Sequence, residues 1–187
     1  MFYYKSKSMK KLVLVIFVFI GQQVNAADFM HDIGLGFWSK LRNTTNGQPT
    51  SYGPNVQYTP RCNFKVKDNI SLSIASPIAV GARFHPYEGN FFQMQLPATL
   101  LLNIGHGSFK KEKHYSNVGG FVGAGFNYIL SASELLREND YGIITTAGMR
   151  FYTHHHSIGI NIQYTHDFIF KNNFVSAGLF YTFGYFE

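Results

Sequence analysis

The sequence predicts an all-β fold, an eight-stranded antiparallel up-and-down transmembrane β-barrel preceded by a cleavable signal peptide. Its 187 residues include 19 Phe, 12 Tyr and 18 Gly, a composition typical of β structure. Apolar and polar residues alternate in eight successive segments, which indicates strands with two different faces. Beyond the signal peptide no apolar run has the length of a membrane helix, so any membrane embedding must come from strands closed into a barrel.

The N-terminal segment has the three parts of a secretory signal peptide. Four lysines precede a short apolar run, and a small-x-small end follows it. We therefore assign residues 1–26 to the signal peptide, with cleavage after Ala26 or Ala27. Residues 27–187 then form one outer-membrane β-barrel domain, because their number suits a single domain.

Composition also limits the classes of function. The signal peptide holds four of the 16 basic residues, so the remainder has 12 basic and 10 acidic residues and a net charge of +2. This balance does not indicate nucleic-acid binding, which needs a clustered basic face. The single cysteine, Cys62, excludes an internal disulfide framework. The start of the chain stays open between Met1 and Met9.

The N-terminal half contains four alternating segments. The first sets three apolar residues against Asp32 and two glycines. The polar triplet 67–69 makes a tight turn between the second and third segments. Pro60 and Pro97 remove ladder donors, so we expect each at a bulge or a strand end. The segments are 32–37, 56–66, 70–84 and 92–104.

The C-terminal half contains four more. The fifth segment alternates branched and aromatic residues with Gly119, Gly123 and Gly125. The eighth alternates Tyr181 and Phe183 with small or polar residues. The segments are 118–128, 143–151, 157–168 and 175–185.

The composition of the polar face predicts which side of the strands is inside. A soluble barrel or sandwich would carry many Lys and Glu on its polar face, which would meet water. Here that face carries mostly Gly, Ser, Thr, Asn and Gln, which suit the crowded lumen of a narrow barrel. The apolar face, with aromatic residues near strand ends, suits lipid. A soluble barrel remains the alternative.

Two stretches carry a resemblance to a known family. "GGFVGAGFNY" (119–128) and the closing "VSAGLFYTFGYF" (175–186) are similar to the small OmpA-like outer-membrane β-barrels of Gram-negative bacteria. The resemblance implies a location in the bacterial cell outer membrane, contact with its lipid, and recognition of the last strand by the barrel-insertion machinery. It also implies a monomer with both termini in the periplasm.

That orientation predicts which connections face the outside. The outer loops would be Arg42–Ser51, His85–Asn90, Leu130–Asp140 and Lys171–Asn173. The connection 106–116 would be a periplasmic turn, and it is long for one. We therefore expect that this hairpin protrudes or that the strand boundaries differ around it.

Charged residues on the polar face form the candidate site. Charges inside a narrow lumen must pair or stay hydrated, because unpaired burial is costly. We favour a structural polar plug, since an eight-stranded barrel is filled by its side chains. The alternative is a narrow anion-preferring path, because cations outnumber acids four to two. The predicted lumen residues are Asp32, Arg61, Lys65, Arg83, Arg150 and Asp167.

The histidine-rich stretch before the seventh segment suggests two other chemistries. Of His154, His155 and His156, only the first and third could converge on a metal from a strand, so we predict no metal site and no cofactor. His155 and Ser157 also give the His-x-Ser of outer-membrane lipid A deacylases, but Ile158 follows instead of Asn. We therefore assign no catalytic residues.

The sequence thus predicts a barrel with a structural or surface-interaction role and no enzymatic activity. A narrow, porin-like solute channel is the first alternative, and a lipid A-modifying hydrolase is the second. The sequence identifies no surface ligand.

Overall fold

A computed structural model of the chain describes residues 27–41, 51–85, 89–108, 117–133, 137–153, 156–169 and 171–183. The predicted signal peptide, the loop 42–50 and the last residues, 184–187, lie outside them. Within the described residues no helix is long and apolar enough to cross a membrane.

The described residues form one antiparallel sheet. Two of its strands, β3 and β4, are halves of one long strand interrupted at Ser76-Pro77, because both pair with β2 on one side and β5 on the other. The strands are β1 (Ala27–Leu41), β2 (Ser51–Lys67), β3 (Ile70–Ala75), β4 (Ile78–His85), β5 (Gly89–Gly105), β6 (Val118–Ala132), β7 (Arg137–Thr153), β8 (His156–Asp167) and β9 (Asn173–Phe183).

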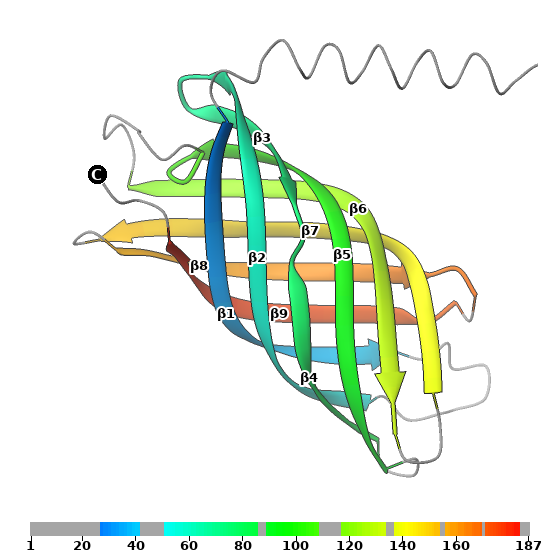
Figure 1. The fold of residues 1–187 in the computed structure, drawn as a ribbon. Helices are drawn as coiled ribbons and strands as arrows, with labels where there is room; N and C mark the ends of the chain where they lie inside the picture. The colour runs from blue at the N-terminus through cyan, green and yellow to red at the C-terminus, as the bar shows by residue number, and fades with distance from the viewer. Residues whose placement is uncertain are drawn as a thin grey trace, which may run out of the picture.

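The sheet closes into a barrel. Each strand pairs with its neighbours in the chain, and β1 pairs with both β2 and β9, so the ring has eight strand positions (Figure 1). The predicted fold is thereby confirmed. The chain enters β1 and leaves β9 at one end, which we call the terminal end; the β2–β3 turn lies there too. The opposite end is the loop end.

The barrel is apolar outside and polar inside. Along β8 every second residue is exposed, and the exposed series includes Ile158, Ile160 and Ile162. The alternate residues, among them Asn161 and Gln163, are buried. Large apolar side chains are exposed on every strand of the ring, which is the surface of a protein that lipid surrounds.

The strands are longer than the alternating pattern indicated, above all at the loop end. The predicted loop Leu130–Asp140 is wrong, because β6 runs to Ala132 and β7 begins at Arg137. The start of β7 was missed because its first outward residues, Arg137 and Asn139, are polar. Without large apolar residues on one face, the period of two is not visible.

The prolines also differ from expectation. Pro60 and Pro97 lie inside β2 and β5 and flank the interruption between β3 and β4. Ser76 N–H donates to the Pro60 carbonyl at 3.1 Å, and Ile78 N–H donates to the Ser76 carbonyl at 2.8 Å. The Ser76 hydroxyl donates to the Pro97 carbonyl at 2.6 Å. The prolines therefore interrupt the strand between them rather than their own strands.

The outward direction of the apolar face is testable with one substitution. Ile160 is 46 % exposed in the middle of β8, so Ile160→Arg should place a charge in the hydrocarbon and destabilise the barrel by about 2–4 kcal/mol. The measurement is urea unfolding of the protein in lipid vesicles, with Ile160→Leu as the matched control. A cost below about 0.5 kcal/mol, typical of a site in water, would contradict this orientation.

Candidate functional site in the barrel lumen

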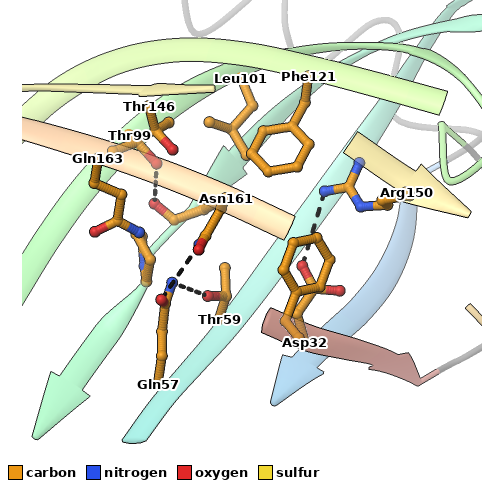
Figure 2. Close-up of a pocket in the computed structure, with 13 residues that line it drawn as sticks. Asp32, Gln57, Thr59, Thr99, Leu101, Phe121, Thr146, Arg150, Asn161 and Gln163 are labelled. Atoms are coloured by element: carbon orange, nitrogen blue, oxygen red, sulfur yellow. Dashed lines mark hydrogen bonds and ion pairs between the residues drawn. The ribbon is translucent and has the colours of Figure 1, made fainter. Parts of the chain in front are cut away.

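Three buried charges form a cluster in the terminal half of the lumen. Asp32 from β1 is 6 % exposed, and Arg61 from β2 and Arg150 from β7 are each 1 % exposed. One carboxylate oxygen, Asp32 Oδ2, lies 3.5 Å from Arg61 Nε. The same oxygen lies 3.8 Å from Arg150 Nη2 (Figure 2). One acid thus serves two guanidinium groups from opposite sides of the ring.

Neutral side chains extend this cluster around the wall. Arg150 Nη1 donates to Asn103 Oδ1 at 3.1 Å. Asn103 Nδ2 donates to the Ser73 hydroxyl at 2.6 Å, which donates to Asn63 Oδ1 at 2.5 Å. Asn63 Nδ2 reaches the sulfur of Met30 at 2.9 Å. The hydrogen bonds connect β7, β5, β3, β2 and β1, so they bind one half of the lumen together.

Two aromatic rings cover Arg150. Its guanidinium carbon lies 4.3 Å from the centroid of Phe121 and 5.7 Å from that of Phe180, within cation–π range. Each ring packs directly against a glycine, where any larger residue would place its side chain. A Cβ on Gly148 would lie 2.3 Å from the Phe121 ring, and one on Gly159 would lie 2.2 Å from the Phe180 ring. The lumen therefore needs glycine at these positions.

A second cluster fills the loop half. Lys40 Nζ lies 3.0 Å from Glu138 Oε2 and 3.0 Å from Asp140 Oδ2. Arg83 Nη2 contacts the same Glu138 oxygen at 3.0 Å. The Arg83 guanidinium carbon also lies 4.5 Å from the centroid of Phe91. Lys40, Arg83 and Asp140 are buried, so this ion-pair network closes the lumen towards the loops.

Two predicted lumen residues lie near the strand ends. Asp167 is fully buried and accepts hydrogen bonds from the backbone N–H groups of Tyr141 and Ile169, each at 3.2 Å, so it orders the turn after β8. Lys65 differs from the expectation. Its side chain is 47 % exposed and lies 3.0 Å from Asp68 at the β2–β3 turn, because β2 extends past the rim of the ring.

The observed charges change the electrostatic prediction. The predicted set had four cations and two acids, which favoured anions. The structure adds Lys40, Glu138 and Asp140 to the interior and leaves Lys65 at the rim. The two clusters and Asp167 then contribute four cations and four acids, and half-buried Asp28 lies on the same face of β1 as Asp32, so the premise of an anion-preferring path is lost. The sequence contains a sign of these added residues. Lys40 lies an even number of residues from Asp32, so the two side chains are on the same face of the strand.

A small cavity lies in the middle of the lumen. This cavity of about 20 Å³ lies between the two clusters, bounded by Asp32 and Arg150 on one side and by Gln57, Asn161 and Gln163 on another (Figure 2). That volume holds on the order of one water molecule. The Asn161 amide donates to Gln57 Oε1 at 3.3 Å, so polar groups line the cavity and also bind one another.

The connection after β5 covers the terminal mouth of the lumen. His106, Gly107 and Ser108 are buried, and Arg61 Nη1 donates to the Gly107 carbonyl at 2.9 Å. The His106 ring lies 4.8 Å from that of Tyr152. The described start of this connection thus folds over the barrel end instead of protruding; the rest of it, 109–116, lies outside the described residues.

Of the residues considered for metal binding and catalysis, His156 and Ser157 are described, and they lie on opposite faces of β8. His156 faces outward and its Nδ1 lies 2.9 Å from the Tyr181 hydroxyl, whereas Ser157 is 1 % exposed inside the terminal end. His154 and His155 lie outside the described residues. Within the described part of the chain no group of three or more His, Cys, Asp or Glu side chains could hold a metal ion.

The closed ring, its apolar outer wall and its filled polar interior define a class of protein. The chain is a small transmembrane β-barrel of the outer-membrane type.

Solved structures have the same fold. The chain is similar to Neisserial surface protein A, with a TM-score of 0.59 and 10 % identity, over 86 % of this chain and 99 % of that one. It is also similar to Ail, the attachment invasion locus protein of Yersinia pestis, in complex with the heparin analogue sucrose octasulfate. There the TM-score is 0.51 and the identity 13 %, over 84 % of this chain and 99 % of that one. No family model and no curated protein sequence matches the chain.

The shared carboxylate of the terminal cluster gives the second prediction. Asp32→Asn should leave two buried guanidinium groups without a counter-charge and destabilise the barrel by about 3–5 kcal/mol. Asp68→Asn is the matched control, because it removes an exposed partner of Lys65 and should cost on the order of 0–1 kcal/mol. Urea unfolding in vesicles measures both, and equal costs would show that the lumen pairing contributes nothing.

Proposed function

We propose that the protein is a non-enzymatic outer-membrane barrel that presents its loop end for interaction and does not conduct solutes. One observation carries this proposal. Paired charges fill both halves of the lumen, and the cavity between them has a volume of about 20 Å³. A lumen of this kind contributes stability and a fixed shape, which suits a scaffold for surface loops.

The arrangement of the lumen residues also disfavours the two alternative functions, a solute channel and a lipid A hydrolase. A solute path would have to pass the Lys40–Glu138–Arg83 network at the loop end and the turn 105–108 at the terminal end. A lipid A hydrolase would need a nucleophile open to the outer leaflet, whereas Ser157 is buried inside the terminal end. Both observations support a role at the surface.

Conductance separates the proposal from the channel alternative. Purified barrel in a planar lipid bilayer should give no resolvable current steps, because the lumen is filled. If steps appear and Arg150→Gln changes their ion preference, the lumen is a path and the structural proposal is wrong. Folded protein is verified beforehand by its altered gel mobility before and after boiling.

The loop end also favours one class of ligand for testing. Arg137 at the start of β7 and Lys171 between β8 and β9 are exposed at this end. The structurally similar Ail is described in complex with a heparin analogue. These two points support a sulfated polysaccharide as the first probe, since exposed cations attract sulfate groups.

Heparin binding is therefore the next measurement. Replacing Arg137 and Lys171 with serine should weaken heparin binding by several-fold and lower its dependence on salt, because two exposed cations are lost. Lys67→Ser is the matched control, since Lys67 is exposed at the terminal end. Equal binding by all three proteins would remove sulfated polysaccharide as a ligand at these residues.

A further inference from the structure

The wall of the barrel is weak along one line. Register places Ala75 opposite Thr99 and Ala79 opposite Gln95, so Pro77 lies opposite Pro97. Successive strand residues direct their N–H groups to alternate sides. Ser76 donates to Pro60 in β2, so residue 77 should donate to β5, but it is proline. Neither Pro77 nor Pro97 has an N–H group, and the ladder has no donor there.

The same line crosses a third strand. Pro60 accepts from Ser76 N–H but cannot return the bond that an antiparallel pair would make. Pro60, Pro77 and Pro97 therefore interrupt the ladder across three neighbouring strand positions. We call this line the proline seam. A second gap in the ladder, between β2 and β4 at Gly53 and Pro54, involves one proline, whereas the seam combines three, so we expect the wall to bend at the seam.

The part of the wall on the terminal side of the seam forms one unit. It comprises 61–75 and 98–108, which we call the flap. The Asn69 carbonyl accepts hydrogen bonds from Gly105 N–H at 2.9 Å and from the Ser108 hydroxyl at 3.2 Å. Arg61 also binds the Gly107 carbonyl. The β2–β3 turn and the turn that covers the terminal mouth are thus fastened to each other.

Side chains that cross the lumen fasten the flap to the rest of the barrel. Arg61 of the flap lies near Asp32 of β1, and Asn103 of the flap accepts from Arg150 of β7. Along its other edge the flap pairs with β6 residues 119–125, of which four are glycine. Glycine adds no side-chain contact along that edge, so the backbone ladder and the cross-lumen contacts together hold the flap closed.

We propose that the flap is a hinged element that bends outward at the proline seam and uncovers the terminal end of the lumen. Its lumen face includes Ala75, Thr99 and Leu101, which line the cavity opposite Asp32 and Arg150. Outward bending enlarges this cavity and removes the turn 105–108 from the mouth. The loop-half network belongs to other strands and stays closed, so the lumen is hydrated from one end only.

Amide hydrogen exchange of the full barrel in lipid nanodiscs tests this device. In the native protein the amides of β3 and of 98–105 should exchange together, and at least about tenfold faster than those of β8. Asn103→Ala removes the acceptor for Arg150 and should raise exchange of the flap about tenfold while β8 is unchanged. Pro60→Val with Pro97→Thr restores two ladder donors and should slow exchange of the flap.

A matched control lies in the same strand. Pro54 is exposed on the same face of β2 as Pro60 but on the loop side of the seam, so Pro54→Val should leave exchange of the flap unchanged. The proposal is overturned if flap and β8 amides exchange alike in the native protein, or if the Pro54 control slows the flap as much as the seam variants do. The native comparison does not depend on any variant folding.

Discussion

From β7, the side chain of Arg150 reaches four other strands of the ring. It lies beside Asp32 of β1, donates to Asn103 of β5, and stacks against rings from β6 and β9. A guanidinium buried at this depth is costly unless it is paired and hydrogen-bonded. The positions around it are constrained in turn: an acid on β1, an amide on β5, and glycines where the rings must fit.

The filling of the lumen follows from that constraint. Two clusters share the interior. The terminal cluster has two guanidinium groups for one carboxylate, and the loop cluster has two cations and two carboxylates. Aromatic rings and amides lie among the charges, and the cavity between the two clusters has a volume of about 20 Å³. Loops that extend from such a wall start from fixed positions, which favours a surface role over transport.

Parity along the strands accounts for what the sequence could predict. Alternation determined the face of each strand, so Asp32, Arg61, Arg83, Arg150 and Asp167 could be assigned to the interior from their neighbours alone. It could not determine where each strand ends. Glu138 and Asp140 were assigned to a loop because their outward neighbours are polar. Lys65 was assigned to the lumen by alternation, but it is exposed because β2 runs past the rim. The ion pairs that cross the lumen join strands far apart in the sequence, and they form only when the barrel closes. The alternation within one strand therefore could not predict them.

The two ends of the barrel differ in how easily they can move. At the loop end, Lys40 and Arg83 hold one carboxylate between them, and local opening would separate buried charges. At the terminal end, ladder hydrogen bonds are missing along the proline seam, and neutral amides and hydroxyls carry much of the cross-lumen contact. A closed ring has no edge strand at which to fray. Mobility therefore has to come from donors removed within the wall, as they are at the proline seam.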